Sequence, residues 1–382
     1  MKNNFIFLEV STDYPISFNA GNTKMELMAR GVIEAGGSVF TVNNWASTTQ
    51  YHNDIKGVSN DGIPYVTFDS KVRFKTISNF KKTYRILKKN KKKDHNNAVI
   101  LSTSRSYYML LDIIAAKLNG YKTLFLFHEW RGALKIKSTF HRFDAWLKDH
   151  FIVRLFDAYL PISHYLLDKC NHISRRKKKL IVPILSDYSI KPKKHTIKER
   201  FSYCCGVLYM LRHPMLLDAM DKLVEKHSNA ELLLILSGND KDMENFKEQI
   251  KARKCANNIT IRTKVPFDEL KEIYSSSLAL IIPLNPESVA DIARFSQKIA
   301  EYIATGRPII TNNVGEIPYY FKNGESAYIA DYSSDGFYKI MTEIIEDKEK
   351  ANLIGETGFN VGTECFNYKK SSASLIEFIN NI

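Results

Sequence analysis

The stretch RFSQKIAEYIATGRPII, residues 294–310, predicts a short helix that runs into a buried strand. Ser296 suits the N-cap position, and two isoleucines four residues apart lie on one apolar face of the helix that follows. Gly306 suits the helix end, and Pro308 excludes further helix before the apolar strand residues. A helix followed at once by a buried strand is one unit of a parallel α/β sheet.

The same alternation of strand and helix runs along the rest of the chain. A near-continuous apolar run at 277–284 is typical of a strand that is covered on both faces. A charged segment with one proline at 189–202 indicates a linker between two α/β halves. We therefore predict the α/β class, with a parallel sheet in each half. Strands are expected at 5–10, 38–42, 98–104, 122–129, 157–163, 201–209, 230–238, 258–265, 277–284 and 308–312, and helices at 25–37, 107–120, 132–156, 213–227, 242–254, 267–277, 337–355 and 368–382.

Length and composition favour a globular protein of two domains. The chain has 382 residues, of which 44% are apolar and 25% are charged. No segment approaches the run of about 18 apolar residues that crosses a bilayer, and the N-terminus has too short an apolar stretch for a secretory signal. The five cysteines show no metal-binding spacing. A cytoplasmic location without a disulfide framework or zinc site is the simplest expectation.

Positive charge is the outstanding bulk property, with 55 basic residues against 41 acidic ones and a formal net charge of +14. Basic runs lie at 81–95 and 175–179, and a solvated surface is the simplest explanation of both. An anionic membrane surface is the functional alternative, whereas nucleic acid is disfavoured because no nucleic-acid-binding motif is present. The basic amphipathic segment 132–156, together with the run at 81–93, suggests the hypothesis of docking to lipid.

The helix that begins near Ser296 predicts a candidate anion site. Its first amides have no partner within the helix and are directed toward the loop after the strand at 277–284. Lys298 would add positive charge, and Glu301, three residues later on the same face, could accept hydrogen bonds from a cis-diol such as ribose. The alternative is a solvated ion pair worth roughly a few tenths of a kcal/mol.

At this point the order of elements resembles the family-4 retaining glycosyltransferases, which have the GT-B fold. The resemblance is carried by KIAEYIATGRPIIT at 298–311, followed by GEIP at 315–318. In that family the helix bears a glutamate before a turn of the type A-x-G-x-P, and Glu301 precedes such a turn here. Further segments match in the expected order over nearly the whole chain: AGNTK at 20–24, FHEW at 127–130, DAYLPIS at 157–163, YCCGVLYMLRHPMLLDAM at 203–220, AELLLILSG at 230–238 and FDELKEIYSSSLALIIP at 267–283.

The resemblance implies two Rossmann-like, doubly wound domains that face a central cleft. It implies an acceptor-binding domain at 1–190, a nucleotide-sugar-binding domain at 200–362 and a helix at 363–382 that returns to the first domain. The implied reaction is metal-independent and needs no cofactor. It transfers a sugar, with retention of configuration, from a nucleoside-diphosphate donor to a glycan or lipid-linked acceptor. Cell-surface polysaccharide synthesis at the inner face of the plasma membrane is the expected setting.

The resemblance also implies roles for matched residues. His128 would lie near the donor sugar, while Arg212 and Lys298 would stabilise the charge that grows on the leaving diphosphate. These three are the expected catalytic residues. The expected donor-binding residues are Gly21, Gly206, His213, Ser296, Gln297 and Glu301, with Glu301 at the ribose.

Two positions depart from the family's pattern. Ala293 stands where many members have a glutamate that contacts the donor sugar, and Glu287 would replace it only if the loop were rearranged. Val207 stands where an arginine often follows the first glycine of the phosphate loop. Two alternatives therefore stay open, a degenerate GT-B scaffold without activity and a sugar-nucleotide epimerase. The sequence does not identify the donor nucleotide, sugar, acceptor, linkage or oligomeric state.

Overall fold

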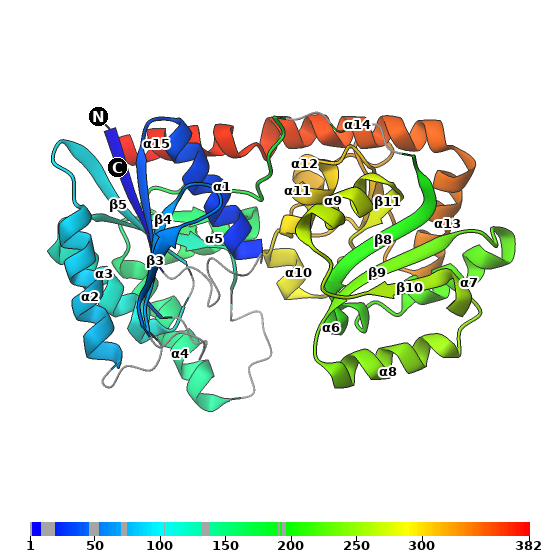
Figure 1. Ribbon diagram of the computed structural model, residues 1–382, viewed down its shortest axis with the longest axis horizontal. Helices are drawn as coiled ribbons and strands as arrows, with labels where there is room; N and C mark the ends of the chain where they lie inside the picture. Colours follow the sequence, from blue (N-terminus) through cyan, green and yellow to red (C-terminus); the bar gives the residue numbers. More distant parts are fainter. Residues whose placement is uncertain are drawn as a thin grey trace. The chain divides into compact units, whose positions relative to one another are not determined.

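A computed structural model describes residues 2–8, 20–45, 53–69, 75–102, 104–130, 138–189, 192 and 196–382. The chain divides into two compact units, shown in Figure 1. The N-terminal unit comprises residues 1–185, 293–295 and 366–382, and the C-terminal unit comprises residues 186–292 and 296–365. Each unit is an α/β domain with its own sheet, which confirms the predicted fold class.

The N-terminal unit is built on a seven-stranded sheet of order β3-β4-β2-β1-β5-β6-β7. Neighbouring strands are parallel, except for β3 and β4, which pair antiparallel at the edge. The central strands are buried on both faces, as their continuous apolar runs predict. The strands are β1 (Lys2–Leu8), β2 (Ser38–Asn43), β3 (Ile55–Val58), β4 (Pro64–Thr67), β5 (His95–Ser102), β6 (Lys122–Phe127) and β7 (Ala158–Pro161).

Helices connect these strands and cover the sheet. The connection from β1 to β2 is made by α1, and α2, α3 and α4 follow one another across the next part of the unit. The helical elements are α1 (Ala20–Glu34), α2 (Lys75–Asn90), α3 (Ser106–Leu118), α4 (Thr139–His150), the 3₁₀ turn η2 (Ile152–Leu155) and α5 (His164–Ile173).

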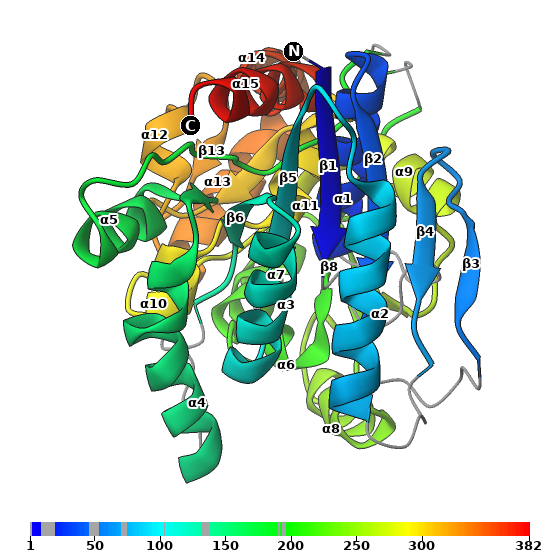
Figure 2. The ribbon, with the colours of Figure 1, turned by 90° about the vertical axis from the view of Figure 1, so that its left-hand side faces the viewer.

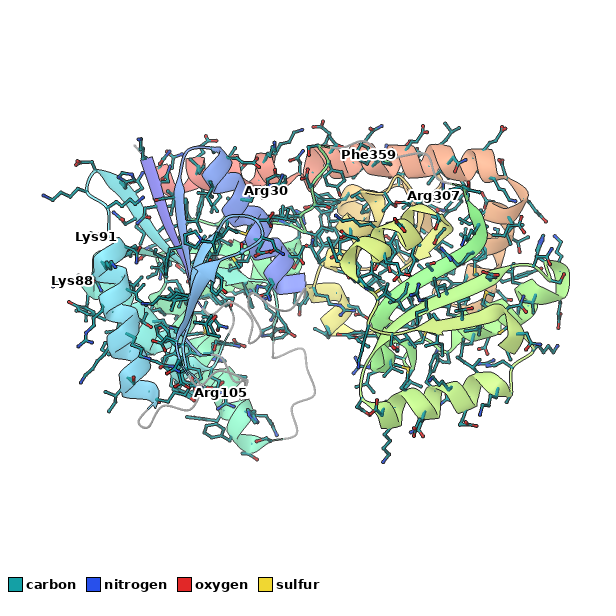
Figure 3. The ribbon with its side chains drawn as sticks, viewed as in Figure 1. Arg30, Lys88, Lys91, Arg105, Arg307 and Phe359 are labelled. Carbon is teal, nitrogen blue, oxygen red and sulfur yellow. The ribbon has the colours of Figure 1, made fainter. Side chains whose placement is uncertain are left out.

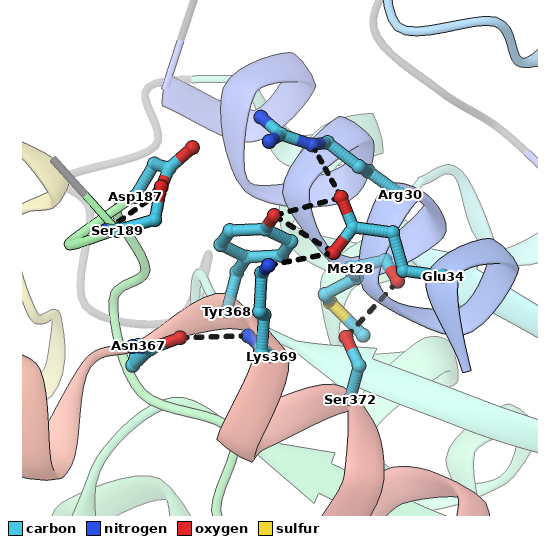
Figure 4. A network of polar contacts seen from close by, with 9 residues as sticks. All are labelled: Met28, Arg30, Glu34, Asp187, Ser189, Asn367, Tyr368, Lys369 and Ser372. Carbon is cyan, nitrogen blue, oxygen red and sulfur yellow. Dashed lines mark hydrogen bonds and ion pairs between the residues drawn. The ribbon is translucent and has the colours of Figure 1, made fainter.

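The last helix of the chain, α15 (Tyr368–Asn380), belongs to the N-terminal unit and packs on α1. The Tyr368 hydroxyl donates to the two carboxylate oxygens of Glu34 at 2.9 and 3.0 Å (Figure 4). The Ser372 hydroxyl donates to the Met28 carbonyl at 3.1 Å, where Gly31 leaves room for close approach because a Cβ there would meet Ser372 Oγ at 2.3 Å. The chain terminus therefore completes the core of this unit.

The C-terminal unit has a six-stranded sheet of order β10-β9-β8-β11-β12-β13, in which all neighbouring strands are parallel. Its strands are β8 (Lys198–Gly206), β9 (Glu231–Ser237), β10 (Ile259–Arg262), β11 (Ser277–Ile281), β12 (Ile309–Thr311) and β13 (Tyr328–Ile329). Its helical elements are α6 (Val207–Met210), α7 (Met215–Lys226), α8 (Asp240–Lys251), η3 (Ala256–Asn258), α9 (Phe267–Ser275), α10 (Val289–Ala293), α11 (Gln297–Ile303), α12 (Ile317–Tyr320), α13 (Ser334–Glu346) and α14 (Lys348–Cys365).

Several elements differ from the sequence expectations. The sequence indicated no element between the strands at 38–42 and 98–104, yet β3, β4 and α2 lie there. The helix expected at 337–355 is two helices, because Asp347 ends α13 and its carboxylate accepts from the Lys350 amide at the start of α14. The segment expected at 132–156 contains α4 and η2, while residues 132–137 lie outside the described part. Of the linker expected at 189–202, residues 190, 191 and 193–195 also lie outside the described part, and β8 begins within the rest at Lys198.

In the described part of the chain, no helix combines the length and the apolar character that a bilayer crossing requires.

Candidate functional site

The helix α11 begins and ends where the sequence predicts. Ser296 is the N-cap residue with extended backbone angles, although its side chain makes no capping hydrogen bond. Gly306 follows the helix with a φ of 72°, a left-handed conformation that favours glycine. The seven residues of α11 bury their apolar face against the unit, so that the other face carries the polar side chains.

Lys298 and Glu301 form an ion pair on the polar face of α11. Lys298 Nζ lies 2.8 Å from Glu301 Oε2, and the side chains are 33% and 14% exposed. Burial alone would lower the pKa of Lys298, but the negative charge of Glu301 and the nearby thiol of Cys204 outweigh it and raise the pKa. The ammonium group therefore stays charged at neutral pH.

A hydrogen bond joins α11 to the end of β8. The backbone amide of Cys204 donates to the hydroxyl of Tyr302 at 2.9 Å, and Tyr302 is fully buried in α11. Gly206 ends β8 two residues later. The structure thus brings α11 to the carboxyl end of the central parallel strand β8, where Lys298 lies near Cys204; this is the edge at which open α/β sheets bind ligands.

Arg212 and His213 lie in the turn between α6 and α7, after Gly206. Arg212 is exposed, with its guanidinium carbon 5.4 Å from the centre of the Tyr209 ring. His213 is only 1% exposed, and its Nδ1 lies 2.9 Å from the hydroxyl of Tyr332. Arg212 is therefore the more accessible cation of this turn.

The two positions that depart from the family's pattern lie in different elements: Ala293 ends α10, and Val207 begins α6. Ala293 is buried, and its carbonyl accepts a hydrogen bond from the Ser163 hydroxyl at 2.6 Å. Glu287 is exposed, and its backbone amide donates to Asn285 Oδ1. Val207 is buried at the start of α6, and Gln297 is buried at the start of α11. Small and apolar side chains therefore occupy the two departing positions.

His128 and Gly21 belong to the N-terminal unit. His128 directly follows β6 and is half-buried; burial and the nearby charge of Lys24 lower its pKa to about 4. Its imidazole is therefore neutral at physiological pH. Gly21 lies in the first turn of α1 and is exposed, rather than in a loop ahead of the helix.

Lys24 is a residue that the sequence reasoning did not select. It lies in α1, is almost completely buried, and donates from Nζ to the Val182 carbonyl at 2.5 Å. Burial lowers its pKa to about 7. The sequence expectation began this helix at Met25, one residue after Lys24, whereas α1 begins at Ala20; a helix extended by one turn would have placed Lys24 four residues before Met28, on its apolar stripe.

A cavity of about 550 Å³ also lies in the N-terminal unit, beside α4 and α5. Trp130 donates from Nε1 to Asp149 at 2.9 Å, and the Lys169 ammonium lies 3.4 Å from the centre of the Trp130 ring. Aromatic and apolar walls with a few placed polar and charged groups are the usual lining of a small-molecule pocket. The other lining residues are Phe127, His150, Val153, Arg154, Tyr165, Asp168, His172 and Ile173.

Among the residues that the structure describes, no group of three or more His, Cys, Asp or Glu side chains is placed to hold a metal ion.

One family model matches part of the chain. Residues 191–361 match the family model described as glycosyl transferases group 1. A comparison with curated proteins gives no match.

The whole chain also resembles solved structures at low sequence identity. Sucrose-phosphate synthase from Thermosynechococcus elongatus superimposes with a TM-score of 0.76 at 12% identity, covering 100% of this chain and 99% of that one. HepE from Anabaena in complex with UDP gives a TM-score of 0.72 at 11% identity, with 100% of both chains covered. A glycosyltransferase from Rickettsia africae gives a TM-score of 0.72 at 15% identity, covering 100% of this chain and 98% of that one.

These likenesses show the fold, which is GT-B. With a glycosyl transferases group 1 domain at 191–361 in a chain of GT-B fold, the protein is a glycosyltransferase.

Proposed function

We propose that the protein transfers a sugar from a nucleoside-diphosphate-sugar donor, bound through Lys298 and Glu301, to a glycan or lipid-linked acceptor. The observation that carries the proposal is the 2.8 Å pair on α11, joined through Tyr302 to the end of β8. The pair lies within the glycosyl transferases group 1 domain. The HepE neighbour was solved with UDP, which supports a nucleoside diphosphate as the group that leaves the sugar.

The charges of the candidate site suit this chemistry. Transfer breaks the bond between the anomeric carbon and the diphosphate, so negative charge grows on the diphosphate oxygens. Lys298, with its raised pKa, and the exposed Arg212 are the cations that would stabilise this charge. Glu301 accepts from Lys298 at Oε2, which leaves Oε1 to accept from a ribose hydroxyl. The neutral imidazole of His128 would contact a hydroxyl of the donor sugar.

From the order of the matched segments we also propose that the protein belongs to family 4, that the sugar is transferred with retention of configuration, and that the reaction needs no metal or cofactor. Gly21, Gly206, His213, Ser296 and Gln297 would complete the donor site. The N-terminal unit would bind the acceptor, and its cavity at Trp130 supplies aromatic and charged groups for it. The setting would be polysaccharide synthesis on the cytoplasmic side of a membrane with anionic lipids.

Donor binding tests the role of Glu301. Replacing Glu301 by Ala removes a carboxylate that would accept charge-assisted hydrogen bonds worth about 1.5–3 kcal/mol, so the dissociation constant for the donor nucleotide should rise about 10- to 100-fold. Calorimetric titration with UDP, GDP and ADP, and with their sugars, measures this constant. Glu356→Ala, an exposed glutamate of α14 in the same unit, is the matched control. Equal affinities of Glu301→Ala and the wild type would remove the ribose assignment.

Turnover separates transfer from the other activities of such a scaffold. The protein is incubated with each nucleotide sugar, with and without a panel of glycan and lipid-linked acceptors. Nucleoside diphosphate released together with a glycosylated acceptor is the expected result. Conversion of the sugar nucleotide without any acceptor would instead indicate an epimerase.

A further inference from the structure

Three helices of the N-terminal unit form one outer layer. Figure 2 shows α2, α3 and α4 facing the viewer, and residue contacts join α2 to α3 and α3 to α4. Their inner sides are fixed by buried carboxylates. Asp112 of α3 accepts from the side chains of Asn44 and Trp45, both at 2.7 Å, and Asp144 of α4 accepts from Ser106 at the start of α3. The layer is therefore held in place by contacts that leave its outer side open.

The outer side of this layer carries an unusual number of exposed apolar side chains. Those of α4 and the residues after it are between 40% and 62% exposed, and three of them form one aromatic cluster. The ring of Trp146 lies 5.8 Å from that of Phe143 and 5.4 Å from that of Phe151. Scattered exposed apolar residues are normal on a protein surface, but a contiguous aromatic group marks a contact site. The aromatic cluster consists of Phe143, Trp146 and Phe151; Phe140 and Leu155, and Ile114 and Leu118 of α3, are exposed as well.

The exposed charged side chains of the three helices are basic, while the exposed Asp94 and Asp157 lie in the segments beside them. Across the three helices there are only three acidic residues; Asp112 and Asp144 are buried, and Asp149 accepts from Trp130 and is not exposed. The outer side therefore presents no exposed carboxylate from these helices. Exposed cations are numerous on α2 and just after it, where Lys88 and Lys91 project from the edge of the unit (Figure 3). The exposed cations of α2, of α4 and of the residues that follow each include Lys81, Arg85, Lys88, Lys89, Lys91, Lys92, Lys93, Arg142 and Arg154.

We propose that this layer, defined by the outer sides of α2, α3, α4 and residues 151–155, docks on an anionic phospholipid surface. Aromatic side chains prefer the boundary between headgroups and acyl chains, while lysine and arginine bind lipid phosphates. The clustering of the rings with aliphatic neighbours favours a bilayer over nucleic acid, where aromatic rings would stack singly between bases. The inference deepens the proposed function, because a membrane surface is where a lipid-linked acceptor would be met.

Vesicle sedimentation of the full-length protein tests the proposal. Vesicles of phosphatidylcholine alone are compared with vesicles containing phosphatidylglycerol, at low salt and at high salt. The wild type should partition at least tenfold more strongly to the anionic vesicles at low salt. The double variant Phe143→Ser/Trp146→Ser should lose most of this partition at both salt concentrations. The variant Lys81→Gln/Arg85→Gln/Lys88→Gln/Lys89→Gln should lose it mainly at low salt.

The matched control removes the same number of charges from the C-terminal unit. Lys241, Lys247, Lys264 and Lys271 are exposed there, and changing all four to Gln should leave partition within about twofold, since general charge is lost but the layer is intact. Donor binding by calorimetry checks that each variant is folded and separates this inference from the proposed function. Wild-type protein that binds donor but partitions equally to both vesicles would overturn the docking proposal alone. Binding to duplex DNA or RNA that the basic variant abolishes and the aromatic variant keeps, without vesicle binding, would assign the layer to nucleic acid instead.

Discussion

At the scale of single residues, the charge of Lys24 helps to set the pKa of His128 and, through it, the pH dependence of folding stability. His128 follows β6, Lys24 lies in α1, and burial together with the charge of Lys24 lowers the pKa of His128 to about 4. A depressed histidine pKa means that the unfolded chain binds a proton more tightly than the folded one between pH 6.5 and 4. His128 therefore contributes stability that is present above pH 6.5 and is lost as the pH falls toward 4.

We expect Lys24→Met to raise the pKa of His128 toward its ordinary value near 6.5 without reaching it, since burial is the larger cause and remains. Methionine has the length and flexibility to fill the buried site of Lys24. An NMR titration of the histidine ring protons measures the shift, with the His128 signal assigned by His128→Gln. Lys56→Met, which removes an exposed lysine of the same unit, should leave the titration unchanged. An unaltered His128 pKa in Lys24→Met would show that burial alone sets it.

The two residue pairs also show what a sequence can reveal at this scale. Lys298 and Glu301 could be placed together in advance, because residues three apart on a helix share a face whatever the rest of the fold does. Lys24 and His128 come from different elements, and nothing local in either segment indicates that they meet. The burial of His213 against Tyr332 could not be predicted for the same reason.

At the scale of elements, α14 supports the candidate site because it packs against the turn that follows α11. Arg307, labelled in Figure 3, donates to Asn352 of α14 and to the Leu278 carbonyl of β11, each at 2.7 Å. Gly355 of α14 lies against the backbone of the turn after α11, where a Cβ would meet the Gly306 carbonyl oxygen at 2.3 Å and the Pro308 nitrogen at 2.8 Å. The turn that ends α11 is thus fixed by direct backbone contact.

Gly355→Ala should destabilise the protein by about 1–3 kcal/mol, although alanine is the better helix former, because the contacted atoms are backbone and cannot move aside. Urea denaturation monitored by circular dichroism measures the change. Glu356→Ala, at the next and exposed position of α14, should alter stability by no more than about 0.5 kcal/mol. Equal free energies of unfolding for the two variants would show that α14 can move away from the turn at 306–308 without loss of stability.

A helix or strand could be predicted from the sequence where its buried residues form an apolar repeat, and it was missed where they do not. The helices α7 and α15 and the strand β11 carry such repeats and appear as expected. The helix α2 was missed because two of its three buried residues are polar: Asn79 donates to the Asn44 carbonyl, and Thr83 accepts from the Asn44 side chain. Its basic outer residues therefore dominate the sequence pattern.

At the scale of the whole molecule, the N-terminal unit is not one continuous segment of the chain. Residues 366–382 belong with residues 1–185 rather than with the segment that precedes them. The side chains of Tyr368, Leu375 and Ile379 are fully buried in the core that also contains Met25, Met28 and Val32 of α1. The family resemblance implied such a returning helix, but the periodicity of 368–382 indicated only that a helix forms, not which unit it covers.

A fragment comprising residues 1–185 should therefore not fold on its own, since loss of α15 leaves the apolar face of α1 open to water. Joining residues 366–382 to its end through a flexible glycine–serine linker should restore one cooperative urea transition, because tethering supplies the missing helix at high effective concentration. The same fusion with Leu375→Asp and Ile379→Asp keeps the length and linker but places two charges in the core, and it should behave like the bare fragment. A bare fragment that unfolds at the same urea concentration as the fusion would mean that α15 lies on a core that is already complete, and the burial of Tyr368, Leu375 and Ile379 would then contribute nothing to the stability of this unit.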